Sequence, residues 1–257
     1  MRLMKRILSA AAVLALSASL LVGCSSTASS VPASASSAAE STVSSVEETA
    51  SSAVDENEAA AAQLLNDLTG SYQELWPVIL ADEYKQTWLD DCTALVGEDN
   101  AEAAFEKLSS MVTGDVYGED AVKAYANGGG AYFCGFTNSL AILTFDGETS
   151  TISGTDKDGN VLFSHTYHYI GMEPVHGLYE FESDDADSGE FTYFFLAPDT
   201  SAETYHIEFR YGSDAEALSQ YDAGEYAYWV ASGISTDCDQ TMIDNCIELF
   251  CTENLAG

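Results

Sequence analysis

The chain has 257 residues, with 8 basic and 42 acidic side chains and a formal net charge of −34 at pH 7. This balance excludes nucleic-acid binding as a function class, because that function needs Lys and Arg to neutralise phosphates. It also disfavours direct docking of a folded domain on an anionic membrane surface.

Residues 1–24 have the pattern of an export segment. Arg2, Lys5 and Arg6 precede an apolar run over residues 7–22, which is too short and too soon followed by serines for a stable membrane span. The run ends in Leu21-Val22-Gly23-Cys24, which resembles the lipobox of bacterial lipoproteins. The resemblance implies cleavage before Cys24, lipid on its sulfur and anchoring to the cell membrane. The alternative is an ordinary secretory signal followed by a chance cysteine.

Residues 25–62 are rich in Ser and Ala and show no apolar periodicity. Such a composition predicts a flexible tether, whose last residues, 57–62, join the first helix. Residues 63–257 then form one domain with enough chain for a real core.

Cysteine usage leaves the disulfide pairing open. Without Cys24, five cysteines remain: Cys92, Cys134, Cys238, Cys246 and Cys251. An odd number in an exported protein predicts at most two disulfides and at least one free thiol. No Cys-x-x-Cys spacing is present, so a zinc–thiolate centre is disfavoured.

Helical spacing of apolar residues dominates the first half of the domain. It predicts helices over residues 57–80, with a break near Gly70, and over Asp82–Leu95 and Asn100–Met111. Towards the end of the chain, shorter patterns predict helices over Asp214–Ser219 and Asp239–Phe250. Asp237 and Asp239 are the candidate caps of that last helix.

From residue 131 the apolar period changes from helical spacing to two, which predicts strands. The expected strands are Ala131–Thr137, Ala141–Phe145, Thr149–Ser153, Val161–Tyr169, Leu178–Ser183, Phe191–Leu196 and Thr204–Tyr211. Turns are marked by Asp146-Gly147 and Asp158-Gly159-Asn160. Short strands in steady succession predict a mainly β fold with added helices, built on an up-and-down antiparallel barrel.

The hairpin over residues 191–212 carries the candidate chemistry. In its second strand, Thr204, His206, Glu208 and Arg210 share one face, and apolar or aromatic residues share the other. His206 is the residue of this hairpin that titrates near neutral pH. A plain alternative is that the polar residues form the solvated face of an amphipathic strand.

Two stretches together resemble a known family. They are Leu65-Asn-Asp-Leu-Thr-Gly-Ser-Tyr-Gln-Glu-Leu-Trp-Pro77, and Leu196-Ala-Pro198 followed by Tyr205-His-Ile207 and Tyr211-Gly212. Both resemble the ZinT (YodA) family of exported zinc-binding proteins. The resemblance implies a lipocalin-like (calycin) barrel, a divalent metal ion as ligand and a metal-transport partner.

The family's three zinc-binding histidines correspond to Phe194, Thr204 and His206, so only the last position still carries an imidazole. We therefore expect a degenerate zinc site formed by His206 with Glu208 and His176. Such a site should bind zinc more weakly than three histidines, and less at mildly acid pH, where His206 protonates. His165 and His168 are three apart on one strand and point to opposite faces, so they do not chelate one ion together.

Two other functions remain open. One is a metal-free binder that holds a small apolar or peptide ligand in a barrel lined by Tyr and Phe. The other is an interaction module of the cell envelope. No Gly-x-Ser-x-Gly, His-Glu-x-x-His or phosphate-binding loop is present, so the sequence predicts a binding protein and not an enzyme.

Overall fold

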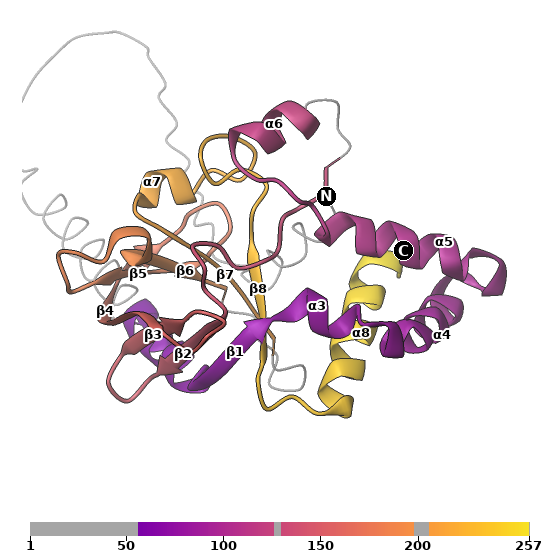
Figure 1. The fold of residues 1–257 in the computed structure, drawn as a ribbon, viewed down its shortest axis with the longest axis horizontal. Coiled ribbons are helices and arrows are strands. Elements are labelled where there is room, and N and C mark those ends of the chain that lie inside the picture. Colours follow the sequence, from indigo (N-terminus) through magenta and orange to yellow (C-terminus); the bar gives the residue numbers. More distant parts are fainter. Residues whose placement is uncertain (1–55, 126–129, 198–205, 257) are drawn as a thin grey trace, which may run out of the picture.

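The structure is a computed structural model that describes residues 56–125, 130–197 and 206–256 (Figure 1). The expected signal peptide, with Cys24, and most of the expected tether lie outside these residues. The first helix is described from residue 56 to residue 67, which agrees with the prediction that the end of the tether joins it.

Within the described residues, eight strands form one closed antiparallel barrel, in which each strand pairs with the next and the last pairs with the first. The strands are β1 (Gly70–Glu74), β2 (Ile142–Asp146), β3 (Thr151–Thr155), β4 (Val161–Met172), β5 (Tyr179–Ser183), β6 (Tyr193–Leu196), β7 (His206–Gly212) and β8 (Ala231–Ser235). The expected antiparallel barrel with added helices is therefore confirmed.

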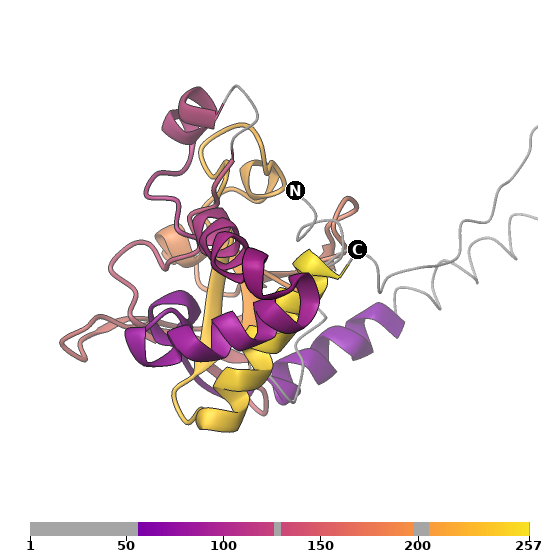
Figure 2. The same ribbon diagram turned by 90° about the vertical axis from the view of Figure 1, so that its right-hand side faces the viewer.

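The helices lie outside the barrel wall. Besides the helix over residues 56–67, they are α3 (Leu75–Ile79), α4 (Lys85–Val96), α5 (Glu98–Val112), α6 (Glu119–Tyr125), α7 (Ala215–Leu218) and α8 (Gln240–Leu255), with 3₁₀ turns η1 (Asp82–Tyr84) and η2 (Gly189–Phe191). Figure 1 shows the barrel on the left and a layer of α4, α5 and α8 on the right, and Figure 2 shows this layer from the front.

Aromatic rings fill the described interior of the barrel. Phe194, Phe209 and Tyr211 are each at most 1 % exposed. The ring centroid of Phe194 lies 5.4 Å from that of Tyr211 and 6.3 Å from that of Phe209. An eight-stranded barrel is just wide enough for its own side chains, so these rings leave little room for a ligand among them. The same core receives Leu64 and Leu65 from the helix over residues 56–67 and Leu68 from the turn directly after it.

A second core lies between the barrel wall and the helical layer. Its centre is a group of rings in which Phe250 lies 4.8 Å from Trp76 and 5.9 Å from Trp88, measured between centroids. Ile234, on the outer side of β8, belongs to this cluster. The wall formed by β1 and β8 therefore separates two hydrophobic cores.

The strand expected over Ala131–Thr137 is wrong. In this segment only Phe133 forms β-bridges, one to Thr113 and one to Trp229. Side chains bind much of the remaining backbone instead. The indole of Trp229 donates to the carbonyl of Gly135 at 2.9 Å, and the hydroxyl of Tyr211 accepts from the Thr137 amide at 2.6 Å.

The helix expected over residues 57–80 is wrong for Gly70–Glu74, which form β1. Tyr72 points into the barrel there and pairs with β2 on one side and β8 on the other. Strand β8 and helix α6 were not expected either. At Gly233 in β8 an added Cβ would lie 3.1 Å from Cγ1 of Ile207, so close packing of the wall selects small residues and hides the strand pattern.

The alternation predicted for β7 is confirmed for its described residues. Ile207, Phe209 and Tyr211 face the barrel interior, whereas His206, Glu208 and Arg210 face outward. The expectation of a solvated outer face is wrong at Arg210, which has no exposed surface. Residues that follow β7, among them α7, fold back over this face and cover it.

Candidate functional site

His206 and Glu208 are the candidate ligands at the start of β7. They lie opposite Ile234 and Ser232 of β8, on the outer side of the barrel. Both side chains are half-buried. Burial lowers the pKa of His206 to about 4, so its imidazole is neutral at pH 7, which is the form that binds metal ions.

The donors in the described part of the chain do not complete a zinc site. In residues 56–125, 130–197 and 206–256, no three His, Cys, Asp or Glu side chains come together in a way that could hold a metal ion. A structural zinc site usually has four protein ligands and a catalytic site three. His206 and Glu208 supply two, so a site here needs further ligands, such as water.

The structure describes only one of the two positions, 194 and 204, at which this chain lacks the family's histidine. Phe194 lies inside the barrel, paired with Tyr211, and its side chain is on the opposite face of the wall from His206. No side chain at position 194 in this register reaches the outer face of β7. Thr204 lies outside the described residues.

His176 lies in the turn between β4 and β5. Its Nδ1 is 3.3 Å from Oε2 of Glu173, and its ring centroid is 3.7 Å from that of Tyr221. Burial lowers the pKa of His176, and the Glu173 carboxylate opposes this shift. Tyr221 also lies under the guanidinium of Arg210, with 4.2 Å between Cζ and the ring centroid.

His176 is thus placed beside Arg210, near the far end of the outer face of β7 from His206. His206 and Arg210 are four residues apart on this strand, which corresponds to about 13 Å. The structure therefore brings His206 and Glu208 to one face but associates His176 with a different cluster, formed with Glu173, Arg210 and Tyr221.

This buried cluster was missed by the sequence analysis. The guanidinium of Arg210 donates to the carbonyl oxygens of Leu218, Gln220 and Tyr226, with 3.2 Å to Gln220. Glu173, also without exposed surface, accepts from the backbone amides that follow it in the same turn. These bonds hold two turns against the barrel wall, so the cluster positions backbone. The sign of this cluster in the sequence was an arginine within a strand of alternating aromatic residues.

His165 and His168 face opposite sides of β4, as predicted. Each binds one of two neighbouring aspartates through Nδ1: His165 to Asp185 and His168 to Asp184, both at 2.7 Å. Their imidazoles are therefore engaged on the loop that follows β5.

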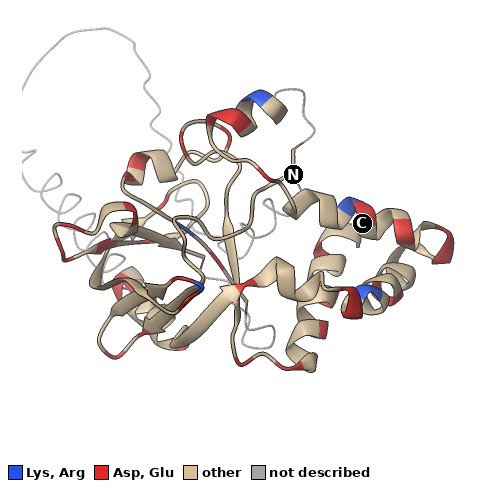
Figure 3. Ribbon diagram, in the orientation of Figure 1, with Lys and Arg blue, Asp and Glu red and all other residues tan. Residues whose placement is uncertain are grey.

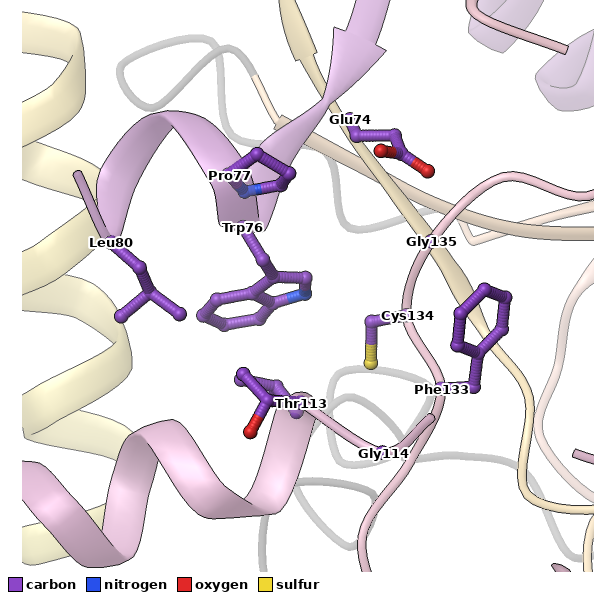
Figure 4. Close-up of a pocket in the computed structure, with 10 residues that line it drawn as sticks. Glu74, Trp76, Pro77, Leu80, Thr113, Gly114, Phe133, Cys134 and Gly135 are labelled. Atoms are coloured by element: carbon purple, nitrogen blue, oxygen red, sulfur yellow. The ribbon is translucent and has the colours of Figure 1, made fainter. Parts of the chain in front are cut away.

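A cavity of about 330 Å³ lies on the outer side of the barrel, where β1 passes into α3 (Figure 4). Glu74, Trp76, Phe133 and Cys134 line it, together with the end of α5. Oε1 of Glu74 accepts from the amide of Phe136 at 2.6 Å. Trp76 and Cys134 lie side by side in this lining, and burial raises the pKa of the Cys134 thiol.

Comparison with known proteins finds similar solved structures. Neither a family model nor a curated protein matches the sequence. The chain is similar to the solved Zn(II)-bound ZinT-like domain of Streptococcus pneumoniae AdcA, with 16 % identity and a TM-score of 0.45 over 72 % of this chain and 89 % of that one. It is also similar to Zn(II)-bound AdcA from Streptococcus pneumoniae, with 17 % identity and a TM-score of 0.42 over 73 % of this chain and 35 % of that one. The chain thus spans about a third of the second structure.

None of the helices in the described residues is both long and apolar enough to cross a membrane. The acidic residues are spread over the helices and loops of both halves of the molecule, with few basic residues among them (Figure 3).

Proposed function

We propose that this chain is a membrane-anchored module that binds a divalent metal ion, zinc in the first place, through a reduced site on the outer face of β7. The observation that carries the proposal is the shared orientation of His206 and Glu208 on that face, with the imidazole held neutral by burial. Imidazole nitrogen and carboxylate oxygen are both common zinc ligands. The resemblance of residues 65–77 and 196–212 to the ZinT family supports the choice of metal.

The acidic balance of the chain supports capture of a cation. Removal of the export segment would leave 5 of the 8 basic residues against all 42 acidic ones. Such a surface raises the local concentration of cations and speeds their encounter with the site. A metal-transport partner at the same membrane is the natural recipient of a weakly held ion.

The anchor is proposed at Cys24, where the lipobox-like sequence ends. Lipid on this residue holds the domain at the cell membrane although the domain itself is strongly acidic. Replacing Cys24 by Ala should release the protein into the soluble fraction, and unchanged membrane association of that variant would refute the anchor.

Calorimetric titration with zinc at pH 7 tests the metal site on the full chain. His206→Ala should lower the affinity of the specific component at least about tenfold, because loss of even an outer-shell partner of a ligand commonly costs 10–100-fold. Glu208→Gln should weaken it as well. His168→Ala is the matched control, since it removes an imidazole of β4 that is bound to Asp184. Equal zinc binding by the wild type and His206→Ala would show only condensation of ions on the acidic surface.

A second candidate function is small-ligand binding in the cavity beside Trp76. Its support is the cavity of about 330 Å³ itself, which Trp76 and Phe133 line with aromatic surface. The packed rings of the barrel make this outer cavity a better place for a small ligand than the lumen. Native mass spectrometry of the purified protein should reveal a bound small molecule that is lost in Trp76→Phe; its absence would remove this candidate.

A further inference from the structure

Two buried cysteines meet between helices α4 and α8. Sγ of Cys92 lies 3.9 Å from Sγ of Cys251, and neither residue has any exposed surface. The two residues are 159 positions apart in the sequence and come from helices that pack directly on each other. Their sulfurs are therefore at van der Waals contact without any rearrangement of the helices.

We propose that Cys92 and Cys251 form a disulfide that joins α4 to α8 when the chain folds in an oxidising compartment. This inference is independent of the metal site and rests on export of the chain only for its setting. A disulfide has an S–S length of about 2.05 Å, so the two sulfurs must approach each other by about 2 Å. Small rotations about the side-chain bonds are the simplest way to make that approach.

The chemistry is thiol–disulfide exchange with an external disulfide such as oxidised glutathione. One protein thiolate attacks that disulfide, forms a mixed disulfide and releases one glutathione thiol. The second protein thiolate then attacks the protein sulfur of the mixed disulfide and releases the other. Two electrons and two protons pass from the two cysteines to the external disulfide, which leaves as two thiols.

The contact between Cys92 and Cys251 reduces the number of disulfide pairings that the sequence left open. Cys246 lies on α8 as well, but five residues before Cys251, which turns it to a different side of the helix. Cys134 lies at the cavity beside Trp76, with its Sγ 3.8 Å from the carbonyl oxygen of Tyr132. Cys134 therefore lies away from the contact between α4 and α8, and we expect it to remain a thiol.

Burial determines when the bond forms. It raises the pKa of both thiols, so little thiolate exists in the folded, reduced protein. The bond should form while the helical layer is still assembling, and native reduced protein should oxidise slowly. Once formed, the bond is shielded from reductants by the same packing.

The test begins with refolding of the reduced full chain in a mixture of reduced and oxidised glutathione, followed by alkylation in denaturant. A glutamate-specific protease then cleaves after Glu248 and Glu253, which separates Cys251 from Cys246. We expect one cross-linked product that contains Cys92 and Cys251, about 2 Da lighter than the two thiol peptides together. Recovery of both residues as alkylated thiols, or of either one joined to a different cysteine, would overturn the proposal.

A second measurement uses stability. The oxidised wild type should melt at a higher temperature than wild type that has been unfolded, reduced and refolded in the presence of a reductant. Cys92→Ala and Cys251→Ala should lose this difference, whereas Cys134→Ala should keep it. Equal melting temperatures of the oxidised preparation and the preparation refolded in reductant would count against the bond.

Discussion

A single arginine shows how a charge is used inside this molecule. Arg210 has no exposed surface, and its guanidinium binds backbone carbonyls of the segment that follows β7. Burial of a charge is costly, and removal of one partner from a buried network commonly costs about 3–5 kcal/mol. The arginine therefore stabilises the chain mainly by giving otherwise unpaired carbonyls a fixed fork of donors. It also places Tyr221 against His176.

His206 predicts a specific dependence of stability on pH. Its folded pKa of about 4 lies below the unfolded value of about 6.5. The fold therefore favours the neutral imidazole, and the resulting stability is complete above about pH 6.5 and lost as the pH falls towards 4. The total loss is about 3 kcal/mol for this one group. Urea unfolding of metal-free protein at pH 7 and pH 4.5 measures it.

Carboxylates titrate in the same pH range, so the comparison needs a variant. His206→Gln should lose clearly less stability than the wild type between these two pH values. Equal losses would show that His206 is not buried as described. The low pKa also corrects the expectation that zinc binding weakens at mildly acid pH through His206, because the imidazole is still neutral at pH 5–6.

At the scale of single elements, the sequence predicts β7 well and β8 not at all. In β7 the aromatic residues recur at every second position and face a core, which is the arrangement that a period of two encodes. In β8 both faces are buried, and the sequence Ala-Ser-Gly-Ile-Ser has no apolar alternation to detect. The barrel interior buries one face of β8 and the helical layer buries the other. No local sequence pattern predicts the contact with that layer.

Helix α8 gives a prediction at this scale. Both Asp237 and Asp239 are candidate caps in the sequence, but the structure selects Asp239, whose Oδ1 accepts from the amide of Met242 at 3.0 Å. Asp239→Ala should lower the free energy of unfolding by about 1 kcal/mol. Asp237→Ala is the control and should change it by less than about 0.5 kcal/mol. Urea unfolding compares the two, and equal effects would contradict the assignment of the cap.

For the whole molecule, the barrel was predictable because turns and strand periods repeat through residues 141–211. The two strands that close it, β1 and β8, were not, because they come from opposite ends of the domain and neither has a local strand pattern. The site was partly predictable: strand period places His206 and Glu208 together. The separation of His176 depends on how the turn between β4 and β5 packs on Tyr221, which lies 45 residues away in sequence.

The docking of the barrel's first helix on the β2–β3 turn gives the last prediction. The turn places Gly147 so close to the helix over residues 56–67 that an added Cβ would lie 2.4 Å from Cα of Asn66 and 2.6 Å from the carbonyl oxygen of Leu65. These are backbone atoms, so the helix or the turn must move. The Gly147 amide would also lose its 3.0 Å bond to Oγ1 of Thr69 if the turn moved.

Gly147→Ala should therefore lower the free energy of unfolding by about 1–3 kcal/mol, the usual cost of overpacking. Gly171→Ala, on β4, is the matched control, because its added Cβ would meet its nearest neighbour, Oε2 of Glu180, at an ordinary 3.7 Å. Urea unfolding should show a clear loss for the first variant and little change for the second. Equal unfolding midpoints of the two variants would mean that this helix does not pack tightly on the β2–β3 turn. Its leucines would then belong to a unit that folds separately from the barrel.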